Sequence, residues 1–577
     1  MDRNTFIGLL LIALIVLVWM QLISPPPKPP EKTRFAPIDS SVVIHEDSVF
    51  NAKKQAETLR SMGEFGAAAA GVERLITVET DDFTAKISTK GASLISYVQK
   101  HHLNYKKEPF NLVSSPSGAT SIFFQSNDGR NIRTADLYFT LLAEDSIFTV
   151  SGNAKLELPF ILNLDNGKSI QITYSFNSAG YTIGYTPLFK GFENGIFGNE
   201  IQVEWAGGIM SSEKDKVDES ANSYANAYQA GSLVKLDASS KDEKYKEQPS
   251  GKTKWVSVQS KFFCAALISG SDGTGAYLEG KHIAKSEKDV FEDYTVALRQ
   301  PLVPNLEMKE NFTIYLGPLD YKPMKALGVD LEKTMDFGWE WVTRPFAEWL
   351  ILPVFNFMRE YIPSFGLIII IFALFIKLVT YPLTIASTNS MKKMASLQPQ
   401  LQEIQERFKD NPTKLQSELG KVYRDAGVNP VSGCLPVLLQ LPLLYALYNV
   451  FKASIQLRQQ SFLWAQDLSV PDSIFDFPFS IPIYGDHIAV YPILMGVTIW
   501  VQQKVTPTTA PTEQMKIFMY IFPAMMLLFF NNMPAGLGLY YLMFNVFGIV
   551  QQIYINKTTP PAPVVHHVHE PKKKKKK

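Results

Sequence analysis

Apolar and polar positions divide the chain into membrane-spanning stretches and a large soluble insert. A run of about 20 apolar residues can cross a bilayer as a helix. We interpret six apolar stretches as spans, namely residues 1–23, 364–384, 434–451, 488–502, 517–530 and 537–553. The pattern predicts a polytopic α-helical membrane protein with an uncleaved N-terminal anchor and a five-helix core at 364–556.

The insert between the first two spans, residues 71–325, has the alternation typical of strands. Apolar residues occupy every second position in two clear examples: Ile170, Ile172, Tyr174 and Phe176, then Phe312, Ile314 and Leu316. Clusters of Gly, Asn, Asp and Ser separate such runs. We therefore expect a large all-β sandwich, with residues 211–250 as a surface excursion. No motif for catalysis stands out, so we expect packing or partner binding.

Two segments flank the β domain. Residues 24–70 are proline-rich, then charged, then alanine-rich, and are interpreted as a linker. Residues 337–363 are interpreted as a helix in the membrane surface, because Trp339, Phe346 and Trp349 share one face. An ordinary amphipathic core helix is the alternative.

A polar stretch after the second span predicts an antiparallel helical hairpin at 391–426. Apolar residues recur at helical spacing on both sides of Asp410, Asn411 and Pro412, which supply a cap and a first-turn proline. Gly427 closes the second helix.

The span at 364–384 carries a lysine, Lys377, inside its apolar run. At 3.6 residues per turn, Lys377, Thr380, Tyr381 and Thr384 share one helical face. A buried charge is costly in a bilayer, so this stripe predicts a polar cavity. The alternative is a lysine that extends its stem to the headgroups.

Other spans also carry polar residues. These are Gln440 in the third span and Tyr540, Tyr541 and Asn545 in the last. Each could be a structural contact between helices, which is common in membrane bundles. Together with Lys377 they favour a shared hydrated groove.

Charge placement orients the chain in the membrane. The net charge is only +1, but basic residues gather in the hairpin and in the tail at 557–577, while acidic residues gather between the third and fourth spans. The positive-inside rule therefore places both termini and the hairpin in the cytoplasm and the β domain outside. The lysine tail is a candidate contact for RNA or anionic lipid, or else a solvated charge run. Two cysteines and scattered histidines give no basis for a disulfide framework, a metal site or a cofactor.

Long stretches resemble a known family. They include KLVTYPLTIASTNSMKKMASLQPQLQEIQERF, YRDAGVNPVSGCLPVLLQLPLLYALYNVF and NNMPAGLGLYYLMFNVFGIVQQ. This region, about 337–556, resembles the YidC branch of the membrane protein insertases. The anchor and outer β domain resemble the Gram-negative inner-membrane members, and WVSVQSKFF resembles a motif of their periplasmic domain.

The resemblance implies an insertase and chaperone, not an enzyme, that inserts newly made membrane proteins through a hydrophilic groove. It would act alone or with the Sec translocon and its accessory subunits. The residue aligned with Lys377 is arginine in most bacterial members. Lysine keeps the positive charge but lacks the planar guanidinium with its several donors. The hairpin and tail would meet the ribosome, and membrane lipids would contact the spans. Candidate hairpin residues are Met391, Lys392, Lys393, Arg407, Lys409, Lys421 and Arg424. A secondary transporter with a midplane lysine site is the alternative, although we find no inverted repeat.

Overall fold

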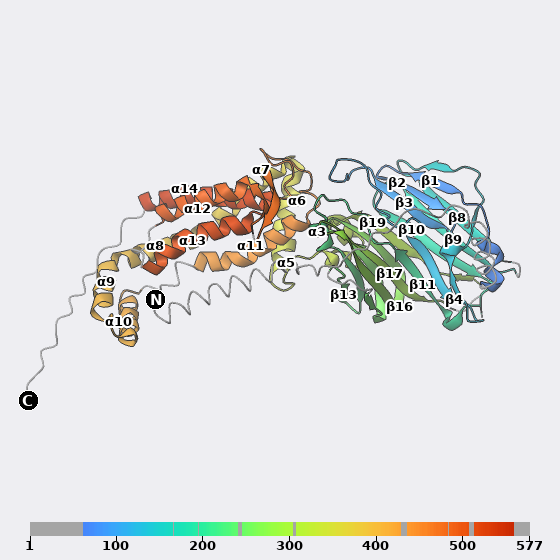
Figure 1. Ribbon diagram of the computed structural model, residues 1–577, viewed down its shortest axis with the longest axis horizontal. Coiled ribbons are helices and arrows are strands. Elements are labelled where there is room, and N and C mark those ends of the chain that lie inside the picture. Colours follow the sequence, from blue (N-terminus) through green and yellow to red (C-terminus); the bar gives the residue numbers. More distant parts are fainter. Residues whose placement is uncertain are drawn as a thin grey trace, which may run out of the picture. The chain divides into compact units, whose positions relative to one another are not determined.

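The computed structural model describes residues 62–558, except 165–166, 194, 240–244, 304–306, 428–434, 483 and 507–512. The predicted anchor, most of the linker and nearly all of the lysine tail lie outside these residues. Figure 1 shows strands in the N-terminal part of the described chain and helices in the C-terminal part.

The β domain contains a large sheet and a small one. The small sheet has the order β3-β2-β1-β7 and the large one has a main path β5-β4-β11-β17-β16-β19-β10-β9-β8-β6. The small-sheet strands are β1 (Leu75–Glu79), β2 (Phe83–Ser88), β3 (Ser93–Gln99) and β7 (Ile147–Thr149). The main path comprises β4 (Thr120–Gln125), β5 (Asn131–Arg133), β6 (Thr140–Leu141), β8 (Lys155–Asn163), β9 (Ser169–Asn177), β10 (Thr182–Lys190), β11 (Glu200–Ala206), β16 (Phe263–Ser286), β17 (Asp289–Pro301) and β19 (Phe312–Pro318).

Alternating side chains build the core between the sheets. In β9, Ile170, Ile172, Tyr174 and Phe176 are all buried, while the residues between them are half-buried. β9 pairs antiparallel with β10, so that Tyr174 lies opposite Tyr185. The predicted strands and their inward faces are confirmed here, because a period of two places every second side chain on one face.

The expected surface excursion at 211–250 was wrong. It holds a short helix, α3 (Lys216–Ser220), and the strands β12 (Tyr224–Gln229), β13 (Ser232–Leu236) and β14 (Tyr245–Glu247). Ala225 and Ala227 of β12 are fully buried. Small side chains carry little hydrophobic signal in the sequence, but they pack well where sheets approach closely.

The linker also ends earlier than residue 70. Met62 and Phe65 belong to the hydrophobic core of the β domain. The ring of Phe65 packs against those of Phe124 and Phe192, with centroids 5.6 and 6.3 Å apart. The alanine-rich stretch from residue 62 is therefore part of the folded domain.

The C-terminal half is helical. Its helices are α5 (Thr343–Phe346), a π-helical turn at Ala347–Ile351, α6 (Leu352–Tyr361), α7 (Phe365–Val379), α8 (Tyr381–Ser396), α9 (Gln398–Arg407), α10 (Pro412–Asp425), α11 (Leu435–Ala453), α12 (Val490–Val505), α13 (Glu513–Phe530) and α14 (Ala535–Thr558). α14 packs along α7 and α12, and α13 adds to α12. Among the described residues, α14 is long and apolar enough to cross a membrane by itself, and α7 with α8 passes the same test as a bent pair.

The predicted span 364–384 is interrupted. α7 ends at Val379, α8 begins at Tyr381, and the two are bent by 57°. Pro382 causes this break, because a proline has no N–H to donate to the preceding turn and its ring clashes with that turn. Lys377 and Tyr381 therefore lie on different helices, and the single polar stripe along one helix was wrong.

The hairpin has the predicted caps and seam. Asn411 accepts a hydrogen bond from the Lys414 amide at 3.1 Å, and Pro412 opens α10. Gly427 has a positive φ of 62°. Leu397 and Leu401 are buried against Leu419, Val422 and other residues of the second helix.

The loop between α11 and α12 is not simply polar. Arg458 is buried and donates from Nε to Glu213 of the β domain at 2.8 Å, and from Nη1 to the carbonyl of Leu103 at 2.6 Å. Ile455 joins the hydrophobic core of the β domain. The loop therefore packs on the β domain, and both lie on one side of the helical region.

Candidate functional site

Lys377 lies in the last turn of α7 and is only 9% exposed. Its Nζ lies 3.6 Å from the ring centroid of Phe544 on α14. Gly548 leaves room for it, since a Cβ there would come within 2.8 Å of Nζ and 3.2 Å of Gln502 Nε2. The ammonium reaches across to α14 instead of extending to the surface.

No carboxylate pairs with Lys377 in the part of the chain that the structure describes. The ion pairs found there join other residues, mostly at the surface of the β domain. A buried cation without a counter-charge is costly, and a cation–π contact offsets only about 0.5 to 2 kcal/mol of that cost. The site can therefore attract an anionic group from outside the chain.

The other residues of the predicted stripe have local roles. The Thr380 hydroxyl donates to the Ile376 carbonyl at 2.8 Å, and the Thr384 hydroxyl donates to the Thr380 carbonyl at 3.0 Å. Threonine hydroxyls that bond their own helix in this way favour a bend. Tyr381 begins α8 and is half-buried. These residues shape the corner after Lys377 and do not extend one polar face.

The tyrosines of α14 leave polar atoms unsatisfied. The hydroxyls of Tyr540 and Tyr541 are buried without a hydrogen-bond partner among the described residues. Gln440 of α11 lies next to the Tyr540 hydroxyl. Buried hydroxyls of this kind also occur in the β domain, at Tyr97 and Tyr185. The tyrosines alone are therefore a weaker signal than Lys377.

Asn545, unlike the two tyrosines, forms a hydrogen bond to a neighbouring helix. Its Nδ2 donates to Thr498 Oγ1 of α12 at 3.4 Å. Two turns further along α14, Thr388 of α8 donates to Gln552 Oε1 at 3.2 Å, and Gln552 donates to Asn556 at 3.0 Å. These contacts link α8, α12 and α14, as interhelical hydrogen bonds do in membrane bundles.

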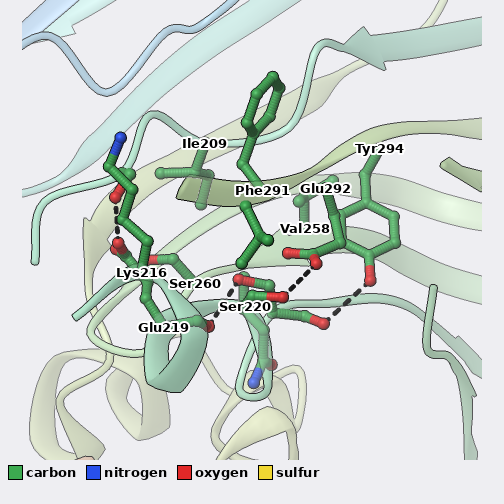
Figure 2. Close-up of a pocket in the computed structure, with 13 residues that line it drawn as sticks. Ile209, Lys216, Glu219, Ser220, Val258, Ser260, Phe291, Glu292 and Tyr294 are labelled. Atoms are coloured by element: carbon green, nitrogen blue, oxygen red, sulfur yellow. Dashed lines mark hydrogen bonds between the residues drawn. The ribbon is translucent and has the colours of Figure 1, made fainter. Parts of the chain in front are cut away.

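A second candidate is a small polar pocket in the β domain (Figure 2). Glu219 accepts hydrogen bonds from Ser211 and from the Ser212 amide, and Glu292 accepts one from Ser220. Burial raises the pKa of both carboxyl groups. Because donors from the same chain already satisfy both carboxylates, the arrangement ties α3 to the sheet. The described residues contain no cluster of ligands for a metal ion.

Comparisons with known proteins cover both halves of the chain. The family model described as 60Kd inner membrane protein matches residues 357–562, and that described as YidC periplasmic domain matches residues 75–349. The membrane protein insertase YidC of Chloroherpeton thalassium is 55% identical over 570 residues, which cover 98% of this chain and 97% of the relative. The chain belongs to the YidC insertase family. YidC of Prosthecochloris aestuarii is also similar, with 53% identity over 588 residues that cover 100% of this chain and 99% of the relative.

Family membership confirms the resemblance seen in the sequence. It identifies an inner-membrane protein whose β domain is periplasmic. YidC proteins are insertases and not enzymes, as the sequence predicted, and the secondary-transporter alternative is set aside.

Two solved structures show only distant likeness. An active YidC insertase with its first transmembrane domain resolved covers 87% of this chain and 98% of its own, with 18% identity and a TM-score of 0.33. A galactose mutarotase related enzyme from Lactobacillus acidophilus covers 42% of this chain and 97% of its own, with 10% identity and a TM-score of 0.28. With TM-scores this low, no feature of the YidC site described above is inferred from either.

Three residues around Lys377 had no signal in the sequence. Phe544 and Gly548 lie on the face of α14 that meets α7, and Gln502 lies near the end of α12. In an apolar span, a phenylalanine and a glycine resemble any packing residue. Only the position of the lysine, supplied by the fold, gives them a role in this chain.

Proposed function

We propose that the chain inserts newly made membrane proteins through a hydrophilic groove in which Lys377 receives the acidic part of a substrate. The groove would be bounded by α7, α11 and α14, with Thr380, Tyr381 and Thr384 at its corner and Gln440, Tyr540, Tyr541 and Asn545 along its wall. The observation that carries the proposal is the buried ammonium of Lys377, which has no counter-charge among the described residues.

The obstacle to insertion is a kinetic barrier, because the inserted state itself is favourable. A span of about 20 apolar residues gains free energy on insertion, whereas an acidic residue that crosses hydrocarbon costs about 2.5 to 3.5 kcal/mol on insertion scales. A fixed positive charge within the bilayer lowers that barrier during transit. The membrane potential adds about 2.3 kcal/mol per charge per 100 mV for acidic tails that move outward.

The proposed topology has six spans, both termini in the cytoplasm and a five-helix core beneath the periplasmic domain. The ion pair between Arg458 and Glu213 supports it, since it requires the α11–α12 loop to lie on the periplasmic side. The opposite ends of α11 and α12 then face the cytoplasm, together with the hairpin. The segment at 337–363 would lie in the periplasmic surface of the inner membrane. Its side chains Trp341 and Trp349 are exposed, as suits that position.

We also propose that the hairpin receives substrates from the ribosome, and that substrates arrive alone or through the Sec translocon. Lys393, Arg407, Lys409 and Arg424 are exposed in the structure and available for such contacts. Lys392 instead donates to the Ile555 carbonyl of α14 at 3.3 Å, and Lys421 pairs with Glu418 at 2.7 Å. Met391 is half-buried.

Substitution of Lys377 tests the groove. Insertion of a single-span substrate with an acidic tail is compared with insertion of the same substrate with a neutral tail. We expect Lys377→Met to lower insertion of the acidic substrate at least about tenfold, because an attraction of several kcal/mol at low dielectric is lost. Lys377→Glu should lower it further, and Lys377→Arg should preserve it. Protease protection of the translocated tail measures each case.

The neutral-tailed substrate is the control. Its insertion should change little in any of the variants, provided that they accumulate in the membrane to the same level. Equal insertion of the acidic substrate by the Met, Glu and Arg variants would contradict the proposed role of Lys377.

A further inference from the structure

The loop between α11 and α12 contains a β-hairpin whose apolar side chains are uncovered. Its strands are β20 (Ser473–Ile481) and β21 (Gly485–Ala489). Ile474, Phe475 and Phe479 are 63%, 58% and 59% exposed. Successive residues of a strand point to opposite faces, so both faces of β20 present apolar groups. A two-stranded hairpin in water usually needs one face packed on a core to be stable.

Aromatic rings form a continuous row on β20. The ring centroids of Phe475 and Phe477 lie 5.5 Å apart, and those of Phe477 and Phe479 also lie 5.5 Å apart. Pro478 and Pro482 interrupt the backbone donors of this segment, since proline has no N–H. Fewer unpaired donors lower the cost of placing a strand edge next to a membrane, where backbone groups find little water.

The hairpin is fixed to the ends of two spans. β21 runs directly into α12, and the side chain of Asn531, which follows α13, donates to the carbonyls of Tyr484 and His487 at 2.8 Å each. Asn531 also accepts a hydrogen bond from the Ala489 amide at 3.0 Å. The base of the hairpin therefore lies where α12 and α13 meet the membrane surface, and the hairpin cannot move freely into the periplasm.

The charges of the hairpin face the β domain. Asp486 pairs with Lys288 at 3.0 Å, and the Asp476 carboxylate lies 3.8 Å from Lys214 Nζ. Asp476 stands between Phe475 and Phe477 in the strand, so its side chain leaves from the face opposite the aromatic row. The row itself carries no charged group.

We propose that the β20–β21 hairpin lies in the periplasmic leaflet of the inner membrane, where Phe475, Phe477 and Phe479 contact lipid at the boundary between headgroups and acyl chains. The row carries no charge and its base is fixed at the ends of α12 and α13, so the bilayer interface lies within reach of the three rings, while Asp476 and Asp486 face the β domain. Aromatic side chains favour this depth. The same loop also exposes Leu463 and Trp464, which would continue the lipid contact.

Site-specific photocrosslinking in proteoliposomes tests the proposal. The full chain, with benzoylphenylalanine in place of Phe475 or Phe479, is reconstituted in phosphatidylethanolamine and phosphatidylglycerol and irradiated. Leu142 of the β domain, which is 76% exposed, provides the matched control position. Mass spectrometry then measures the mass added to the protein. We expect phospholipid adducts at both hairpin positions, at least several-fold above the control position.

The other outcomes overturn the proposal. Adducts with a second copy of the chain would show that the hairpin is an interface between protomers. Adducts no more abundant than at Leu142 would show that the row faces water. Since the substituted side chains are exposed, misfolding is not expected, and gel filtration of each variant before reconstitution checks this.

A second measurement gives the depth. The variants Phe475→Cys and Phe479→Cys carry a fluorophore in a Cys434→Ser background, in which the remaining native thiol, Cys264, is buried. Lipids with a spin label near the headgroup should quench both positions more strongly than lipids labelled at the chain end. Stronger quenching by the chain-end label, or quenching equal to that of the labelled Leu142→Cys variant, would refute the interfacial depth.

Discussion

Gly548 maintains the space in which the Lys377 ammonium rests. Nζ lies against the Phe544 ring on one side and against the α14 backbone at Gly548 on the other. Any side chain at this glycine would push the ammonium away, because a Cβ would lie 2.8 Å from Nζ. The position of the charge thus depends on a neighbour that has no charge itself.

Gly548→Ala should therefore weaken the insertion of acidic-tailed substrates. The lysine stem is flexible and can move, so the protein should fold. The cation–π contact, which contributes about 0.5 to 2 kcal/mol of stabilisation, would be partly lost. We expect a two- to tenfold loss, to order of magnitude, measured by protease protection of the tail. Gly496→Ala on α12 is the matched control, since the nearest atom to its Cβ would be 3.9 Å away. Equal effects of the two substitutions would argue against the positioning role.

At the scale of elements, the helical hairpin of α9 and α10 combines a narrow apolar seam with a charged surface. Leu397 and Leu401 hold α9 against α10, and the Asn411 cap fixes the turn. The seam uses only one side of each helix, which leaves the exposed basic residues free to vary without loss of structure. Structure and contact with partners are thus separated within one element.

Charge reversal at Arg407, Lys409 and Arg424 tests this separation. The triple Glu variant should bind ribosomes more weakly and keep its fold, because these side chains are exposed and take no part in the seam. Co-sedimentation with ribosomes at two salt concentrations measures the effect, which should be larger at low salt. Reversal of Glu403 and Glu406 to Lys is the control and should not weaken binding. Unchanged sedimentation of the triple variant would remove the hairpin as a ribosome contact.

The sequence predicted the elements whose signals are local. The alternation of Ile170 to Phe176 and the cap at Asn411 act within a few residues, and both are found in the structure. The break at Thr380 was missed because Pro382 can either kink a helix or begin a new one, and only tertiary packing decides. Gln502 was missed because its neighbour Lys377 is distant in sequence and becomes close only through the fold.

At the scale of the whole molecule, a buried ion pair joins the periplasmic domain to the insertase core. The Arg458 guanidinium contacts Glu213 at 2.7 Å and lies over the rings of Phe262 and Phe263. The burial of Arg458 could not be foreseen, since its partners lie more than 190 residues away in the sequence. Burial and then Arg458 lower the pKa of nearby His102 to about 4, so this histidine is neutral at physiological pH.

Removal of one partner should destabilise the protein more than removal of both. Arg458→Met leaves the Glu213 carboxylate buried and unpaired, which typically costs about 3 to 5 kcal/mol. The double variant Arg458→Met, Glu213→Leu should recover part of this loss. Thermal unfolding of the full chain in detergent provides the comparison. Additive effects of the two single substitutions would show that the pair is not coupled.

The break after Val379 also bears on the lipid around the protein. With 15 residues, α7 is about 22 Å long at 1.5 Å per residue, whereas the hydrocarbon core of a bilayer is about 30 Å thick. In the proposed topology, where α7 crosses the bilayer, this difference in length would be a hydrophobic mismatch, to which a bilayer can adapt by becoming thinner. Beside α7 a substrate would then have less hydrocarbon to cross, so the corner at Thr380 shortens the path as well as shaping it.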